Sequence, residues 1–222
     1  MDENCYLPDG PGGSRKTFIY TTLWYLLKSK NKKVFTTAFI GIAATLLSNR
    51  KTVHKTFGLP VPLSSDSSSN IKNNSKQSNY LNSINVFIWD GAPVSPKYAF
   101  EVTDRTLCHI IDDNLPFGGM IFILGGDFRQ LLPVKKSTRS KLVNLSIKHS
   151  YHWRQFHQFT LTENMRTLPS KVAFTKFLIN IGEDILNKSH NNLDLSVECR
   201  IFKYDKIIEN ICEEIITDEC YT

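Results

Sequence analysis

The sequence lacks the features of exported proteins, of membrane-spanning proteins and of proteins that are stabilised by zinc or disulfides. Its longest uncharged apolar runs, such as residues 86–89 and 120–124, are far shorter than the roughly 20 residues that a membrane helix needs. The amino terminus has neither the basic start nor the apolar stretch of a signal peptide. The 5 cysteines include no C-x-x-C pair, so neither a zinc site nor a disulfide framework is indicated. We therefore expect an intracellular protein with reduced thiols and no membrane span.

Acidic residues are scarce in the front part of the chain. Residues 1–150 hold 19 Lys and Arg against 10 Asp and Glu, whereas residues 151–222 hold 8 against 11. The 222-residue chain has a formal net charge of +6, with 41% hydrophobic and 22% charged residues, which is ordinary for a folded protein. The basic surplus fits a polyanion partner such as nucleic acid, and it equally fits lysines scattered over a solvated surface.

Short apolar runs alternate with longer helical patterns, which is typical of βαβ units. Residues 5–7, 33–38, 85–89 and 120–124 are predicted strands, and residues 16–30 and 96–112 are predicted helices. These elements predict an α/β fold, a mostly parallel sheet with helices on both faces.

Composition divides the chain further. Residues 64–83 are rich in Ser and Asn and are predicted to form a surface insertion with a short helix near residues 79–83. Residues 1–187 are predicted to form one domain. Residues 188–222 are predicted to be an acidic tail, the start of a second domain that is absent or incomplete.

A glycine-rich segment, residues 9–17, follows the first predicted strand and opens the first predicted helix. Glycines there let backbone N–H groups close around phosphate oxygens, and the helix amino terminus adds partial positive charge. The segment therefore predicts a phosphate-binding P-loop, and the alternative is a glycine-rich loop that merely turns the chain. The predicted nucleotide-binding residues are Gly10, Pro11, Gly12, Gly13, Ser14, Arg15, Lys16 and Thr17.

The last three residues of this loop carry specific predictions. Lys16 would neutralise the β and γ phosphates, and the Thr17 hydroxyl would bind the Mg²⁺ ion that accompanies ATP. The pattern GxxxxGK followed by Ser or Thr has glycine where this chain has Arg15. A side chain at that position is expected to crowd the phosphate path or to disturb the loop backbone.

The predicted strand at residues 85–89 is followed by Asp90, in the arrangement of a Walker B motif. Asp90 would hold the metal ion through water, and the alternative is a turn residue at a strand end. ATPases of this type place a glutamate next, which polarises the attacking water, but this chain has Gly91. Because loss of a general base typically costs about 10²- to 10⁴-fold in rate, we expect poor hydrolysis with binding retained.

Five further segments carry a specific resemblance. They are GIAA at residues 41–44, TVHKTFGLP at 52–60, DRTL to NLPFGG at 104–119, LGGDFRQLLPV at 124–134 and LTENMR at 161–166. In this order they resemble the petite-integration-frequency (Pif-type) DNA helicases of superfamily one, and LTENMR resembles the Helitron-like branch. The resemblance extends over about residues 5–182.

The resemblance implies a RecA-like P-loop NTPase domain, the first motor domain (1A) of an ATP-dependent 5′–3′ DNA helicase that uses Mg²⁺ and single-stranded DNA. It implies that Gln130 senses the γ phosphate, that Arg166 stabilises charge on the transferred phosphate, and that His54 and Phe57 lie at the DNA side. Family roles would be DNA repair, recombination and telomere maintenance in the nucleus, with the mitochondrion as the alternative.

Three hypotheses remain open. One is a helicase domain whose hydrolysis is impaired by the departures at Arg15 and Gly91. Another is a catalytically dead remnant of a transposon-derived helicase that still binds nucleotide or single-stranded DNA. The third is a non-functional fragment whose exposed apolar surface leads to aggregation.

Overall fold

The computed structural model describes residues 4–49, 51–130, 138–167 and 172–183. The described elements belong to one compact unit, Met1–Gly182. The predicted acidic tail, residues 188–222, lies outside the described residues, so the domain boundary at residue 187 stays a prediction. Among the described helices, none is long and apolar enough to cross a membrane.

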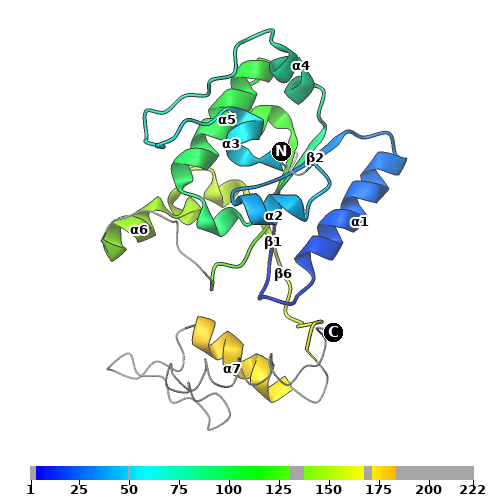
Figure 1. The fold of residues 1–222 in the computed structure, drawn as a ribbon, viewed down its shortest axis with the longest axis vertical. Coiled ribbons are helices and arrows are strands. Elements are labelled where there is room, and N and C mark those ends of the chain that lie inside the picture. Colours follow the sequence, from blue (N-terminus) through cyan, green and yellow to red (C-terminus); the bar gives the residue numbers. More distant parts are fainter. Residues whose placement is uncertain (1–3, 50, 131–137, 168–171, 184–222) are drawn as a thin grey trace, which may run out of the picture. The chain divides into compact units, whose positions relative to one another are not determined.

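The centre of the fold is a six-stranded sheet with the order β3-β2-β4-β5-β1-β6. Every neighbouring pair of strands in it is parallel, which confirms the predicted α/β class. The strands are β1 Cys5–Asp9, β2 Val34–Ala38, β3 Lys51–Thr52, β4 Val86–Asp90, β5 Ile121–Leu124 and β6 His157–Thr160 (Figure 1).

The two edge strands were not predicted from the sequence. β3 has only two residues, Lys51 and Thr52, and all four residues of β6 are exposed. Neither strand has an apolar run, because an edge strand that buries little surface gives no periodic hydrophobic signal. Both strands are held by backbone pairing, β3 to β2 and β6 to β1.

Seven α-helices are described, and the two longest correspond to the predicted ones. The insertion also contains a helix, which starts at residue 76 because the Ser75 side chain caps it by accepting from Ser78 N. The helices are α1 Lys16–Ser29, α2 Gly41–Thr45, α3 Val53–Phe57, α4 Lys76–Asn82, α5 Lys97–Ile111, α6 Arg139–Leu145 and α7 Val172–Gly182. Four short 3₁₀ helices are η1 Ala92–Val94, η2 Pro116–Gly119, η3 Ile147–His149 and η4 Trp153–Gln155.

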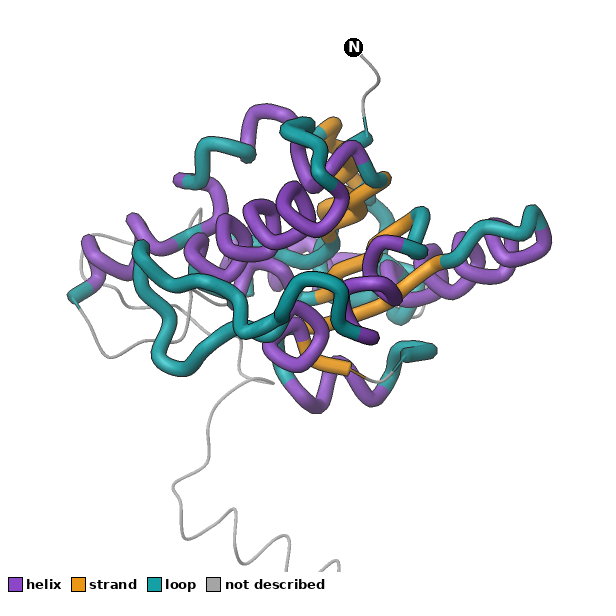
Figure 2. Tube along the Cα trace, turned by 90° about the horizontal axis from the view of Figure 1, so that it is seen from above, coloured by secondary structure: helices purple, strands orange, loops and turns teal. Residues whose placement is uncertain are grey.

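Helices cover both faces of the sheet, because alternate residues of each strand point to opposite sides. On one face Tyr20 and Leu23 of α1 pack against Ile88 and Ile123. The opposite face carries an aromatic core against α3, α5 and η2, formed by Phe35, Phe57, Phe87, Trp89, Phe100, Phe117 and Phe122. Figure 1 shows α1 on one side of the strands and α3 and α5 on the other, and Figure 2 shows the strands between helices.

A buried acid joins α5 to the turn before β5. Asp104 accepts a hydrogen bond at Oδ1 from Phe117 N (2.8 Å), and its Oδ2 lies 2.8 Å from Nε2 of buried His152. Burial raises the pKa of the Asp104 carboxyl, but the hydrogen bonds from His152 and Phe117 outweigh burial, so the net effect lowers it. Phe117 has a left-handed backbone (φ 54°) and stacks on Phe122 with 4.1 Å between ring centroids. Asp104 of the DRTL segment thus holds Phe117 of the NLPFGG segment in place, and we call this contact, with His152, the Asp104 joint.

Candidate nucleotide-binding site

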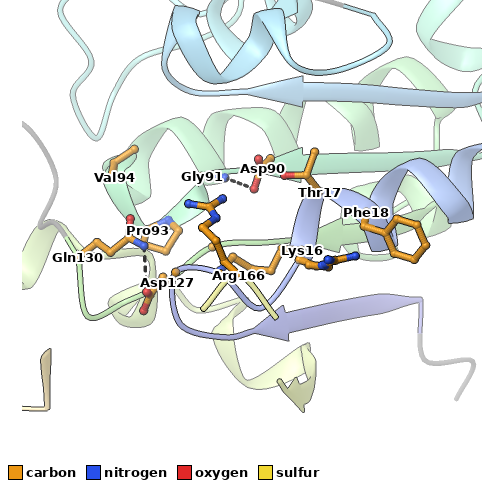
Figure 3. Close-up of a pocket in the computed structure, with 14 residues that line it drawn as sticks. Lys16, Thr17, Phe18, Asp90, Gly91, Pro93, Val94, Asp127, Gln130 and Arg166 are labelled. Atoms are coloured by element: carbon orange, nitrogen blue, oxygen red, sulfur yellow. Dashed lines mark hydrogen bonds between the residues drawn. The ribbon is translucent and has the colours of Figure 1, made fainter. Parts of the chain in front are cut away.

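A cavity of about 450 Å³ lies at the carboxyl ends of β1, β4 and β5, where ligands gather in open parallel sheets. It combines the glycine-rich loop, the residues after β4 and those after β5 with one arginine from the segment after β6 (Figure 3). Its lining residues are Gly12, Gly13, Arg15, Lys16, Thr17, Phe18, Asp90, Gly91, Pro93, Val94, Gly126, Asp127, Gln130 and Arg166.

Arg15 occupies the position just before α1 in a left-handed conformation, with φ 56° and ψ 36°. Glycine adopts this conformation without steric cost, which is the physical reason that the motif has glycine here. The arginine nevertheless takes the same backbone geometry, and its side chain is exposed at the rim of the cavity. Helix α1 begins directly after it at Lys16, so the loop-to-helix junction is formed despite the substitution.

The Lys16 ammonium lies inside the loop. Its Nζ donates to the carbonyl oxygens of Gly10 (2.6 Å) and Pro11 (3.0 Å). Burial lowers the pKa of Lys16, and the nearby carboxylates of Asp127 and Asp90 oppose that shift. The cation is therefore held inside the loop by carbonyl groups that an incoming phosphate can replace.

Asp90 ends β4, and its Oδ1 accepts a hydrogen bond from Gly91 N at 2.9 Å. Burial raises the pKa of Asp90, while the Gly91 N–H and the Lys16 charge partly offset this effect. Figure 3 places the Thr17 side chain beside Asp90.

A hydroxyl and a carboxylate on one wall are oxygen donors of the kind that Mg²⁺ prefers. The described residues contain no cluster of three or more His, Cys, Asp or Glu that could hold a metal alone. The donor set therefore fits an ion that takes its other ligands from a nucleotide and water.

Gly91 follows Asp90 with a left-handed backbone (φ 66°), and a Cβ built on it meets nothing within 4 Å. The cavity is thus open at the position where related ATPases carry a glutamate. Of the residues that line the cavity, Asp127 is the other carboxylate, and it is already engaged. Its Oδ2 accepts from Gln130 Nε2 (3.0 Å) and its Oδ1 from Arg129 N (3.1 Å).

Gln130 and Arg166, which come from distant parts of the sequence, both line the cavity (Figure 3). Gln130 is fixed by its bond to Asp127. Arg166 is exposed, and its backbone N donates to the Asn164 side chain at 2.9 Å. The structure thus brings together the four predicted catalytic side chains, Lys16, Asp90, Gln130 and Arg166.

The segment after β6 is hydrogen-bonded to the glycine-rich loop. Leu161 N donates to Asp9 O (2.7 Å), and Met165 N donates to Gly13 O (3.0 Å). Asn164 Nδ2 donates to the carbonyl oxygen of Gly12 (3.1 Å). This role of Asn164 was missed in the sequence, because a single amide in a motif gives no sign of its partner.

The predicted DNA-side residues have different environments. His54 is half-buried, its ring lies 5.0 Å from the Phe39 ring, and burial lowers its pKa. Phe57 is 0% exposed and packs against Phe87 with 5.4 Å between ring centroids. This burial contradicts a stacking role for Phe57, because a base cannot reach the ring. The apolar side chain of this short helix packs in the core, and the DNA-side role of His54 stays a prediction.

A parallel sheet with a glycine-rich loop after β1 and a carboxylate at the end of β4 defines a RecA-like P-loop domain. The family model for PIF1-like helicases matches residues 2–192. The chain therefore belongs to the PIF1-like helicase family.

Individual relatives agree with this assignment. The chain is 30% identical over 142 residues to the ATP-dependent DNA helicase Pif1 of Psychrobacter sp. (strain PRwf-1), covering 62% of this chain and 21% of that protein. The Bacteroides Pif1 structure in complex with ADP-AlF3 and ssDNA matches with a TM-score of 0.68 and 26% identity, covering 99% of this chain and 54% of that one.

The Pif1 helicase of Candida albicans shares the fold, with a TM-score of 0.67 at 20% identity, over 95% of this chain and 51% of that one. The chain thus spans about a fifth of the curated relative and about half of the solved structures.

Proposed function

We propose that the chain is the first motor domain of an ATP-dependent 5′–3′ DNA helicase, which binds Mg²⁺-ATP in the cavity and uses single-stranded DNA as its track. One observation carries the proposal: a single cavity gathers Lys16, Thr17, Asp90, Gln130 and Arg166 from separate segments of the chain. The Bacteroides relative, which is described in complex with ADP-AlF3 and ssDNA, supports both ligands.

Each residue has a defined task in this proposal. The loop amides and Lys16 hold the phosphates, with Lys16 leaving the carbonyls of Gly10 and Pro11 for the ligand. Thr17 and Asp90 would hold Mg²⁺, which when bound neutralises phosphate charge. Arg166 stabilises charge that develops on the transferred group. Gln130, now bonded to Asp127, changes partner when a γ phosphate arrives.

Hydrolysis is the impaired step. The position after Asp90 offers no carboxylate, and Asp127 is committed to Gln130 and Arg129. We expect slow turnover, lower by about 10²- to 10⁴-fold than with a general base in place. The second candidate, a nucleotide- or single-stranded-DNA-binding remnant without turnover, is favoured by Gly91 itself.

The cellular roles follow from family resemblance. They are repair, recombination and telomere maintenance in the nucleus, with the mitochondrion as the alternative compartment.

Titration of the purified chain with a fluorescent ATP analogue and Mg²⁺ tests the proposal. We expect saturable binding that Lys16→Ala abolishes, and that Lys32→Ala, an exposed lysine beyond the end of α1, leaves unchanged. Circular dichroism checks that both variants fold. Absence of binding by the unaltered chain, or equal binding by Lys16→Ala, would contradict the proposal.

A further inference from the structure

Two charged residues stand directly beside the motif residues of the cavity of about 450 Å³, which we call the nucleotide cavity. Asp9 ends β1 just before the glycine-rich loop, and Arg129 precedes Gln130 after β5. Neither is among the described residues that line the nucleotide cavity. Because β1 and β5 are neighbours in the sheet, the two side chains meet, with Arg129 Nη1 3.8 Å from Asp9 Oδ2. An ion pair therefore connects the entry of the loop with the segment that carries the predicted γ-phosphate sensor.

One buried carboxylate receives both Arg129 and Gln130. Asp127 is 8% exposed, and its Oδ1 accepts from Arg129 N at 3.1 Å and lies 3.5 Å from Arg129 Nη1. Its Oδ2 accepts from Gln130 Nε2 at 3.0 Å (Figure 3). A hydrogen bond to an ionised carboxylate is stronger than one to a neutral acceptor, and a paired cation compensates part of that charge. Arg129 therefore weakens the hold of Asp127 on the Gln130 amide.

Asp9 keeps the Arg129 guanidinium in place. Asp9 Oδ1 is buried and has no hydrogen-bond partner among the described residues, and a carboxylate in such a position requires a paired charge. The side chains of Asp9 and Arg129 are 23% and 25% exposed, so solvent screens this pair less than a surface pair. Arg129 also packs against α7, since a Cβ built on Gly182 would lie 3.0 Å from Arg129 Cβ. The guanidinium is thus held between two carboxylates.

The Gln130 side chain has room on two sides. It lines the nucleotide cavity and also a second cavity, of about 270 Å³, between the glycine-rich loop and α7. A Cβ built on Gly12 would come within 3.4 Å of Gln130 Nε2, so the amide lies against the loop. The strength of the bond to Asp127 therefore decides how readily this amide turns towards a phosphate.

We propose that Arg129 is a positioning residue that acts through Asp127, letting Gln130 respond to a γ phosphate, and that Asp9 holds Arg129 in place. With Arg129 present, the charge of Asp127 is shared, and the Gln130 amide can leave it for the γ phosphate. Without Arg129, the uncompensated carboxylate retains the amide. A nucleoside diphosphate has no γ phosphate and gains nothing from Gln130. This inference rests on the proposed function, because it needs a nucleotide in the cavity.

The affinities for ADP and for adenylyl imidodiphosphate, a non-hydrolysable triphosphate, test this inference. Each is measured with Mg²⁺ by competition against the fluorescent ATP analogue. We expect Arg129→Gln to weaken the triphosphate about 10-fold more than ADP, because one hydrogen bond to a charged group is lost. The matched control, Arg154→Gln, removes an exposed arginine of η4 that is not among the described residues lining either cavity, and should leave both affinities unchanged. Equal weakening of both nucleotides by Arg129→Gln would show a merely structural role and overturn the inference.

A second comparison asks whether Arg129 acts through Gln130. In a chain that carries Gln130→Ala, Arg129→Gln should no longer change the ratio of the two affinities, because the amide that it controls is absent. A shift of the same size in that background would mean that the Arg129 charge acts directly on the phosphates, and it would overturn the inference.

Two milder variants guard against loss of folding, which circular dichroism checks. Arg129→Lys keeps a cation without the planar fork of arginine, and should give a ratio between those of the unaltered chain and Arg129→Gln. Asp9→Asn removes the partner of Arg129 and should shift the ratio in the same direction by about 3-fold. Added to Arg129→Gln, it should lower the ratio no further, because the pair is already broken. A full additional loss would contradict the role of Asp9.

The same titrations separate this inference from the proposed function. Absence of nucleotide binding by the unaltered chain would defeat both. Saturable binding that Lys16→Ala abolishes, with a ratio that Arg129→Gln leaves unchanged, would defeat only this inference.

Discussion

Arg15 and Gly91 occupy nearly the same backbone conformation at two turns of one cavity. Their φ and ψ angles are 56° and 36° at Arg15, and 66° and 30° at Gly91. At the first turn a side chain is present where the motif has glycine, and at the second a glycine is present where related ATPases have a carboxylate. The first departure is conformational and the second is chemical.

The difference separates binding from turnover. A left-handed conformation costs an L-residue roughly 1–2 kcal/mol. The fold tolerates this cost, because α1 still begins at Lys16 and Lys16 still reaches the loop carbonyls. No change of backbone conformation can replace a missing carboxylate. The same pocket is therefore expected to keep phosphate affinity and to lose rate.

The largest expected effect comes from Gly91→Glu. A side chain there enters open space, and we expect ATP hydrolysis to rise by about 10²-fold or more. Phosphate release measures the rate. Gly91→Gln imposes the same backbone cost without a carboxylate and should stay slow. Equal rates for the Glu and Gln variants would show that the acid is not what the site lacks.

A third left-handed residue, Phe117, depends on a buried acid. Asp104→Ala removes the acceptor of Phe117 N and leaves Nε2 of His152 without its partner. We expect the free energy of unfolding to fall by about 3–5 kcal/mol, measured by urea denaturation. Glu101→Ala, on the same helix but only half-buried, should change it by less than about 0.5 kcal/mol. A similar decrease in the free energy of unfolding for both variants would contradict the stabilising role of the Asp104 contacts.

Acid should weaken the same joint. The pKa of Asp104 is lowered in the folded chain, so its stabilisation is complete above the unfolded value of about 3.9 and is lost as pH falls through the folded value. Urea midpoints measured from about pH 5 down to about pH 3 should therefore decrease. Asp104→Asn should flatten this decrease, and an unchanged slope in that variant would assign the acid sensitivity to other groups.

The smallest expected effect is that of Arg15→Gly. Relief of the left-handed strain, reduced by the greater freedom of glycine in the unfolded chain, should raise the free energy of unfolding by about 0.5 kcal/mol. Asn31→Gly, at another left-handed position (φ 56°), should gain less because asparagine tolerates this conformation. Urea denaturation ranks the two variants, and the reverse order would contradict the strain argument.

The sequence predicted the elements that bury apolar surface, namely β1, β2, β4, β5, α1 and α5, because burial leaves a periodic pattern. It did not predict β6, whose exposed residues have no such pattern and are ordered by pairing with β1. The cavity followed from motif residues at strand ends. Phe57 went to the core instead of the DNA side, because an aromatic in a five-residue helix carries no sign of which way it faces.

Contacts between residues far apart in the chain could not be predicted from the sequence either. Nothing in the spacing of Asp104 and His152, or of Gly12 and Asn164, relates one residue to the other. Only the folded sheet brings them together.

The bonds from Leu161, Asn164 and Met165 to the glycine-rich loop have a mechanical consequence. Two of them join backbone to backbone and the third joins the Asn164 side chain to the Gly12 carbonyl, and Arg166 follows immediately. Any shift of the phosphate loop must carry this segment, and Arg166 with it, or break those bonds. We therefore expect the glycine-rich loop and the segment that bears Arg166 to move together.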